Sequence, residues 1–152
     1  MCDISVKIEN KKFNFRVALV PYKDGKILVQ NSVKDGYLSL VGGRVKLNET
    51  TIEAVKRETE EELGFELDAS KLSLIKVCEN FFTYNDKDFH EILFVYKFNW
   101  QECENFNPIK IKDKTDVEAD WIDISTLKDA NIKPAFMKEF NLENGFDHII
   151  IK

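Results

Sequence analysis

The chain has 152 residues, a net charge of −5 and a hydrophobic share of 43% that includes twelve phenylalanines. This length and composition predict a single globular domain, residues 1–152, with a sizeable hydrophobic core. The acidic balance argues against broad nucleic-acid binding, which needs a basic face, but it allows a small anionic substrate that metal cations bridge to acidic side chains.

No targeting segment or redox centre is expected. The start, MCDISVKIEN, lacks the basic and apolar regions of a signal peptide, and no apolar run reaches the roughly 18 residues of a membrane span. Cys2, Cys78 and Cys103 are odd in number and show no CxxC or Cys/His ligand spacing, which is typical of inert thiols. The sequence therefore predicts a cytoplasmic protein without a membrane partner.

The first part of the chain contains three predicted strands. In KFNFRVALV, residues 12–20, apolar side chains alternate with more polar ones before the run becomes apolar throughout. The turn signal Lys-Asp-Gly-Lys at residues 23–26 leads into ILVQ at residues 27–30, which predicts a hairpin. YLSLV, residues 37–41, predicts a short strand that runs into two glycines.

A helix is predicted over residues 51–63. Thr50 is a good N-cap residue, and Glu53 three positions later completes a capping box. Gly64 stands where a C′ glycine ends a helix, because glycine adopts the left-handed conformation without a steric cost. Both ends of this helix therefore have local sequence signals.

The second half of the chain alternates long apolar segments with turns. Residues 72–84 and 88–100 predict two long strands joined by a turn at residues 85–87. The remaining expected segments are a polar loop at 101–118, a strand at 119–124, a helical stretch at 134–140 and a strand at 146–152. Strands around one central helix, with a second helix late in the chain, predict an α+β fold: an α/β/α sandwich in which a mixed sheet packs between helices.

The predicted helix carries RETEEELG, residues 57–64, with four glutamates in five positions. At about 100° per residue, Glu58, Glu61 and Glu62 share one face, and Glu60 points away from it. A neighbouring stripe is expected to face the core, and it consists of Ile52, Val55, Thr59 and Leu63. Three carboxylates are therefore predicted to converge at the border of the core.

Such a cluster needs a physical reason, since two carboxylates about 6 Å apart repel by roughly 3 kcal/mol at an effective dielectric constant near 20. Divalent cations with oxygen ligands offset this repulsion, and Mg²⁺ is the usual ion where phosphates also bind. A solvated acidic helix face is the alternative explanation. The glutamates alone do not decide between the two.

The spacing of the surrounding residues decides. The chain reads G-x5-E-x7-R-E-x2-E-E-x-G-hydrophobic, and the seven fixed identities arise by chance about once in 10⁸ windows. This box, residues 43–65, resembles the signature of the Nudix hydrolases, and the order of the predicted strands is similar to that family as well. Thr59 and Val41 depart from the usual aliphatic residue and proline. The matching residues are Gly43, Glu49, Arg57, Glu58, Glu61, Glu62, Gly64 and Phe65.

The resemblance implies hydrolysis of a nucleoside diphosphate linked to another group, with Mg²⁺ or Mn²⁺ as the cofactor. It implies that Glu58, Glu61 and Glu62 are catalytic metal ligands and that the Gly42 carbonyl is a further ligand. Metal ions in such a site neutralise the anionic diphosphate, lower the pKa of a bound water and stabilise the leaving oxygen.

Supporting roles follow from the same resemblance. Glu49 is expected to support the loop before the helix, in a pair with Arg57, and Arg57 itself is counted with the catalytic residues. Gly43 and Gly64 are expected to have structural roles at the two ends of the box.

The box leaves the general base open, because in the family this role falls to a box glutamate or to an acidic residue from a loop. TDVEADW, residues 115–121, offers Asp116, Glu118 and Asp120 just before a predicted strand. Glu118 is the preferred base among them. A solvated loop carboxylate is the alternative for each of the three.

The predicted substrate wall is CENFFTYNDKDFHE, residues 78–91. Phe81, Phe82 and Tyr84 are candidates for stacking on a base, and Glu91 is a candidate for a further substrate contact. Core packing is the alternative explanation for each aromatic ring. His90 and Glu91 point to opposite faces if the strand is regular.

The leading hypothesis is a metal-dependent hydrolase of a small-molecule nucleotide, either a nucleotide sugar such as ADP-ribose or a nucleoside triphosphate. The alternative from another class is a nucleotide sensor without catalytic activity. The box is complete in every charged position, which argues against a sensor. RNA decapping is a third hypothesis, which the acidic balance disfavours. The oligomeric state is open, and a homodimer is one of the states considered.

Overall fold

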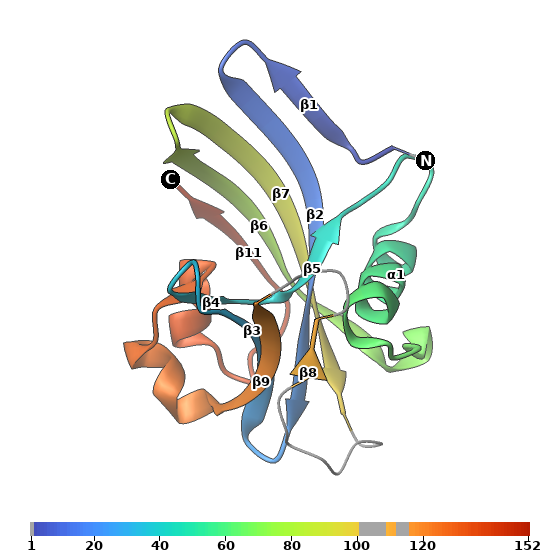
Figure 1. Ribbon diagram of the computed structural model, residues 1–152. Helices are drawn as coiled ribbons and strands as arrows, with labels where there is room; N and C mark the ends of the chain where they lie inside the picture. Colours follow the sequence, from blue (N-terminus) through green and yellow to red (C-terminus); the bar gives the residue numbers. More distant parts are fainter. Residues whose placement is uncertain (1, 101–108, 112–115) are drawn as a thin grey trace.

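The computed structural model describes residues 2–100, 109–111 and 116–152. The described part contains one α-helix, strands of four to thirteen residues, several shorter strands, and 3-10 helices (η) (Figure 1). In chain order they are β1 (Ser5–Ile8), β2 (Lys11–Lys23), β3 (Lys26–Ser32), β4 (Tyr37–Ser39), β5 (Val41–Arg44), α1 (Thr51–Leu63), η1 (Ala69–Lys71), β6 (Leu72–Tyr84), β7 (Lys87–Asn99), β8 (Ile109–Lys110), β9 (Val117–Asp123), η2 (Ile124–Asp129), β10 (Ile132–Lys133), η3 (Ala135–Glu139) and β11 (Asp147–Ile151).

The sheet is mixed and divides along one edge of β2. On its other edge β2 pairs in parallel with β7, which pairs antiparallel with β6, and β6 pairs in parallel with β11. β2 meets β3 only beside their hairpin, at Tyr22 and Lys23, and then pairs with β5 and β1. β3 continues away from β2 and pairs with β4 and β9. β3 and β5 therefore diverge, and we call the space between them the split.

The two faces of the sheet carry separate cores. Val17 and Leu19 of β2 belong to the cluster beneath α1, whereas Ala18 and Val20 belong to a second cluster that includes Leu127 of η2. Alternation along a strand explains this division, because neighbouring side chains point to opposite faces. Figure 1 shows α1 on one side of the sheet and the 3-10 helices of the late chain on the other.

The predicted mixed sheet and α+β class are confirmed, but the second helical layer differs from the expectation. The stretch predicted as a helix at 134–140 is the 3-10 helix η3, five residues long. So short a segment makes too few i→i−4 hydrogen bonds to offset the cost of helix nucleation. β1 was not predicted, although its residues alternate between polar and apolar; three of the four are exposed, so this alternation does not mark a buried face.

The predicted limits of α1 are confirmed. The Thr50 side chain accepts a hydrogen bond from the Glu53 backbone N–H, and the Glu53 carboxylate accepts one from the Thr50 N–H, at 3.2 and 2.8 Å. Gly64 is left-handed with φ 69°, and its N–H donates to the Glu60 carbonyl at 2.9 Å. None of the helices in the described part of the chain is long and apolar enough to span a membrane.

The predicted core face of α1 was wrong in one respect. Ile52 is 41% exposed, and the buried residues are Ala54, Val55, Thr59 and Glu62. On a helical wheel this set is centred roughly 60° closer to the glutamates than the predicted stripe. The reason is tertiary, because the direction from which the sheet meets the helix decides which side is covered. Glu62 lies in the core as a consequence, rather than at its border.

Candidate active site

The two glycines of β5 lie where any side chain would collide with a neighbour. A Cβ on Gly43 would overlap the carboxylate of Glu58, which reaches down from α1. A Cβ on Gly42 would overlap the backbone carbonyl of Val17, on the paired strand β2. Gly43 therefore makes room for the first glutamate of the cluster, and Gly42 allows β5 to pair closely with β2.

Arg57 ties the glutamates to the loop before the helix. Its Nε and Nη2 donate to the two carboxylate oxygens of Glu49, at 2.7 and 2.9 Å. Its Nη2 also donates to the backbone carbonyl of Arg44, at 3.0 Å. Its Nη1 donates to Glu58 at 2.7 Å and to Glu61 at 3.3 Å. A planar guanidinium with five N–H donors can make all of these contacts at once.

The charges of this network stabilise one another. The hydrogen bond from Arg57 holds the pKa of the Glu49 carboxyl below its ordinary value, and the backbone N–H of Lys46 acts in the same direction. Hydrogen bonds to Glu49 and Glu58 raise the pKa of Arg57. Glu49 thus binds both the backbone N–H of Lys46 in the loop and the guanidinium of Arg57 on the helix.

Glu62 lies on the other side of the split, where its side chain is buried. It is 1% exposed, and its carboxylate accepts a hydrogen bond from the side-chain amide of Gln30 on β3. Sequence reasoning missed Gln30, although one signal was present: it is a polar residue at the end of an apolar strand. Thr59 fills its buried slot with its hydroxyl bonded to the Val55 carbonyl at 2.7 Å.

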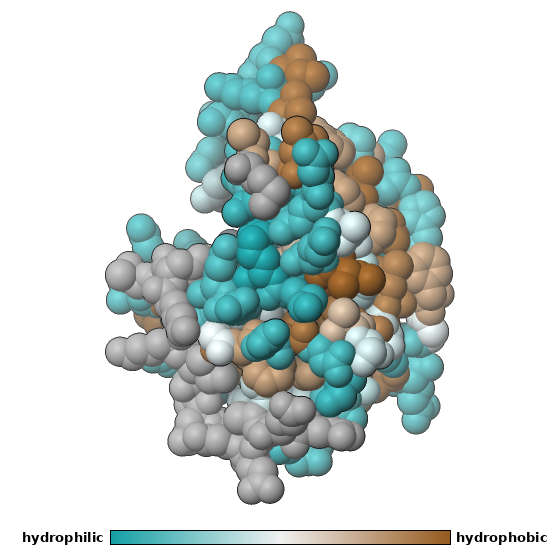
Figure 2. Space-filling model, turned by 90° about the vertical axis from the view of Figure 1, so that its right-hand side faces the viewer, coloured by the Kyte–Doolittle hydropathy of each residue, from teal (hydrophilic) through white to brown (hydrophobic). Residues whose placement is uncertain are grey.

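α1 therefore lies across the split, with Glu58 over β5 and Glu62 against β3. Glu61 is 46% exposed along its side chain, and Glu60 is exposed as well. Figure 2 looks onto the side of the molecule on which α1 lies, and hydrophilic residues gather at its centre. The three predicted ligands thus occupy three environments along one helix rather than one compact cluster.

The donor set fits a hard cation, since Glu58, Glu61, Glu62 and the Gly42 carbonyl offer only oxygen atoms. Within residues 2–100, 109–111 and 116–152, however, no three carboxylate, imidazole or thiolate groups form a ready-made cage. The positive charge between Glu58 and Glu61 belongs to Nη1 of Arg57.

A second polar network lies on the face of the sheet opposite α1. Arg16 of β2 and Arg44 of β5 are paired residues with half-exposed side chains. Glu91 is 8% exposed, and it accepts a hydrogen bond from the Asn14 amide at 2.9 Å and lies 3.7 Å from the Arg16 guanidinium. Ser5 donates to Asn14 at 2.8 Å. This network holds a buried carboxylate beside Arg16, whereas the Arg44 guanidinium pairs with Asp3 at 3.3 Å.

The predicted substrate wall is divided between the two faces. Phe81 pairs with His90, on the face that carries α1. Phe82 pairs with Phe89 and stacks on its ring at 4.9 Å, on the face of Glu91. Tyr84 is exposed and follows Phe82 at the same parity, so it belongs to the Glu91 face as well. Strand alternation therefore separates Phe81 from the other three predicted residues.

Glu118 lies on β9, paired with Asn31 of β3, and it is exposed. The next residue, Ala119, is buried and pairs with Gln30, whose amide reaches Glu62. Alternation consequently turns Glu118 to the opposite face from this contact. Of the remaining predicted residues, Asp120 accepts the backbone N–H of Trp121 at 2.9 Å. Cys103 and most of the predicted loop lie outside the described residues.

Comparison with protein families supports the interpretation of the box. The family model described as NUDIX domain matches residues 12–140. The chain belongs to the Nudix family. The match spans α1 and most of the sheet, and leaves out β1 and β11. A comparison with curated protein sequences gives no match.

Solved structures share this Nudix fold at low sequence identity. The MutT protein of Bacillus halodurans is 16% identical, with a TM-score of 0.70 over 90% of this chain and 88% of that one. A MutT Nudix hydrolase of Burkholderia pseudomallei is 24% identical, with a TM-score of 0.59 over 74% and 84% of the two chains. A structure described as an ADP compounds hydrolase is 17% identical, with a TM-score of 0.52 over 76% and 60%.

Proposed function

We propose that this Nudix protein is a Mg²⁺- or Mn²⁺-dependent hydrolase that cleaves the pyrophosphate bond of a nucleoside diphosphate derivative. The observation that carries the proposal is the position of α1 across the split, with Glu58 over Gly43 and Glu62 against Gln30. The paired residues Arg16 and Arg44 stand on the other face of the sheet, on the strands β2 and β5 that border the split. The glutamates of α1 would offer oxygen donors to a metal ion, and the two arginines would offer guanidinium groups to the phosphates of a diphosphate.

Glu58, Glu61 and Glu62 would hold the metal, with the Gly42 carbonyl as a further ligand. The bound ion would supply charge neutralisation of the diphosphate and activation of a water. Arg57 keeps the Glu58 and Glu61 carboxylates oriented through its two hydrogen bonds. Glu118 remains the proposed general base, and its exposed place at the start of β9 leaves it free to meet solvent and substrate.

The substrate wall of the proposal lies on the Glu91 face. Phe82 and Tyr84 would stack on the base, and Arg16 would bind a phosphate, since a guanidinium matches phosphate oxygens. Glu91 holds Arg16 in place and lies within reach of a ligand on the same face. Both a nucleotide sugar such as ADP-ribose and a nucleoside triphosphate fit these contacts. The proposed substrate is a small nucleotide, and the proposed location is the cytoplasm. Neither a nucleic acid nor a membrane is proposed as a partner.

The test is a panel of nucleotide sugars and nucleoside triphosphates incubated with Mg²⁺, with identification of both products. Cleavage at a pyrophosphate bond that stops on chelation is expected; for ADP-ribose the products are AMP and ribose 5-phosphate. Water labelled with ¹⁸O should place the label on a phosphate. Label in a sugar hydroxyl would show a glycosidic reaction, and turnover that survives exhaustive chelation would exclude the metal mechanism. Binding without turnover across the panel would favour a nucleotide sensor.

A further inference from the structure

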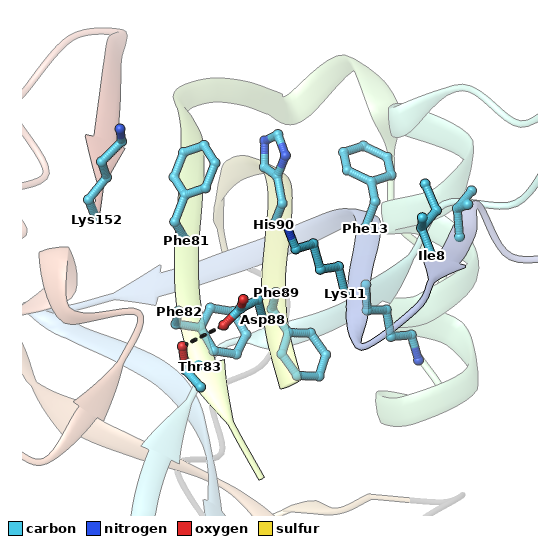
Figure 3. A pocket seen from close by; sticks show the side chains of 12 residues that line it. Ile8, Lys11, Phe13, Phe81, Phe82, Thr83, Asp88, Phe89, His90 and Lys152 are labelled. Carbon is cyan, nitrogen blue, oxygen red and sulfur yellow. Dashed lines mark hydrogen bonds between the residues drawn. The ribbon is translucent and has the colours of Figure 1, made fainter. Parts of the chain in front are cut away.

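A pocket of about 610 Å³ lies at the end of the sheet remote from α1, and Phe82 alone among the residues of the proposed hydrolysis lines it (Figure 3). β1, β2, β6 and β7 contribute its walls, together with Lys152 after β11. The volume falls within the range of sites that bind small molecules, which are mostly apolar with a few polar groups. The pocket is therefore large enough for a nucleotide-sized ligand.

The centre of the pocket is a row of side chains across neighbouring strands. Val6 pairs with Phe13, Phe13 with His90, and His90 with Phe81, so all four side chains stand on the face that carries α1. Figure 3 shows Phe13, His90 and Phe81 side by side and directed to the same side, with Lys152 beyond them. Pairing in register thus builds one continuous surface from four separate strands.

The rings of this row are arranged for contact with a planar group. Phe81 and His90 are stacked, with centroids 4.3 Å apart and an interplanar angle of 24°. Phe13 stands nearly perpendicular to His90, at 5.4 Å and 85°. His90 is exposed, whereas Phe13 and Phe81 are half-buried. Aromatic rings that are held in place by their neighbours bind a nucleobase by stacking, with little preference between bases.

The charged groups of the pocket favour an anion, although the whole chain is acidic. Its lining includes Lys11 and Lys152 against one carboxylate, Asp88, whereas Lys12 pairs with Phe89 and points to the opposite face of the sheet. Thr83 donates a hydrogen bond to this carboxylate at 2.9 Å. The Lys152 ammonium lies 5.6 Å from the centroid of the Phe81 ring, beside the stacking surface. A ligand with a planar ring and a negative group meets both parts of the pocket.

The pocket is separate from the glutamates of α1. Phe13 precedes Val17 by four residues along β2, and Val17 pairs with Gly43, below Glu58. At about 3.3 Å per residue the row lies roughly 13 Å from the level of the glycine pair. A small nucleotide in the pocket would therefore leave the carboxylates uncovered.

We propose that this pocket is a second nucleotide site, which binds a nucleobase carrying a phosphate group without hydrolysing it. The base stacks on the face of the Phe81 ring that is turned away from His90, while His90 holds this ring from the other side, and the phosphate pairs with the lysines at the rim. Either a free nucleoside monophosphate or one nucleotide of a short single strand has this chemistry.

The experiment is a calorimetric titration of the full chain with AMP in EDTA, which removes divalent metal. AMP should bind more tightly than either adenosine or ribose 5-phosphate, because each of these lacks one of the two recognised groups. His90→Ala and Lys152→Ala should each weaken AMP binding about tenfold or more, and His148→Ala is the matched control. His148 is an exposed histidine on β11 that does not line the pocket and pairs with Glu79 at 2.7 Å.

Hydrolysis with Mg²⁺ should remain within twofold in His90→Ala, which keeps this proposal distinguishable from the proposed function. Equal AMP affinity of wild type and His90→Ala would overturn the second site. A loss of AMP affinity only in Tyr84→Ser, on the opposite face of the sheet, would overturn it as well. The second site would also be overturned if wild type did not bind AMP and His90→Ala changed the oligomeric state. That result would assign the pocket to a contact with a second copy of the chain. Binding of tetra-adenylate that is abolished in His90→Ala would support the site. It would also identify a short single-stranded nucleic acid as the source of the bound nucleotide.

Discussion

At the scale of single residues, four glutamates within five positions of α1 have different tasks. Glu58 is held by Arg57 over Gly43, Glu61 is half-exposed, and Glu62 is buried against Gln30. Glu60 is exposed on another side of the helix. Their surroundings, rather than their chemical type, therefore separate them.

Glu60→Gln should keep kcat/KM within a few-fold of wild type, since this side chain has no place in the proposed metal site. Glu61→Gln and Glu62→Gln should lower kcat/KM by orders of magnitude, because each replaces a charged oxygen donor. Steady-state rates at saturating Mg²⁺ on the cleaved substrate measure the difference. Equal losses in all three variants would contradict the assignment of the helix faces.

Gly43→Ala should lower activity through Glu58. The added methyl group occupies the space of the Glu58 carboxylate, so this side chain must leave its position over β5. The Mg²⁺ concentration for half-maximal activity should rise at least tenfold. Gly145→Ala is the matched control, since a Cβ there meets no atom within 4 Å. An unchanged Mg²⁺ dependence in Gly43→Ala would show that Glu58 is not a ligand.

At the scale of elements, the Glu49–Arg57 pair joins the loop before α1 to the helix itself. The pKa of Glu49 is lower in the folded chain than its ordinary value of 4.5, mainly because of the Arg57 hydrogen bond. The unfolded chain therefore binds a proton more readily at acidic pH. The contribution of this pair to the free energy of unfolding is fully present above pH 4.5. It is lost as the pH falls through the lower pKa that Glu49 has in the folded chain.

Glu49→Gln should accordingly be less stable than wild type at pH 7, and the difference should shrink at pH 3. Urea unfolding at the two pH values measures the free energy of unfolding of both proteins. Glu66→Gln is the control, because Glu66 is exposed and lies outside the network, whereas Glu53 takes part in the capping box. A difference that grows as the pH falls would contradict the direction of the Glu49 pKa.

At the scale of the whole molecule, metal binding should appear as stability. An ion that binds only the folded chain stabilises it by about 2.7 kcal/mol at a concentration one hundred times its Kd. Mg²⁺ should therefore raise the melting temperature of wild type, and EDTA should reverse the rise. Glu62→Gln should gain less from Mg²⁺ than wild type does. Thermal melts with and without Mg²⁺ measure this, and an equal gain in Glu62→Gln would exclude Glu62 as a ligand.

The sequence by itself determined the features that have local causes. Thr50, Glu53 and Gly64 set the limits of α1, because capping groups satisfy backbone atoms within one turn of each helix end. Alternation marked the long strands, and the spacing of the box identified the family. The partner of Glu49 was also predictable, since Arg57 lies eight residues away on the adjoining helix.

Only the tertiary structure decided how these parts meet. The burial of Glu62, the exposure of Ile52 and the contact with Gln30 depend on how α1 is rotated against a sheet whose strands come from distant parts of the chain. The parallel pairing of β2 with β7 placed Phe13 beside His90. Such pairings arise from contacts far apart in sequence, and no local pattern encodes the direction from which a partner strand or helix will arrive.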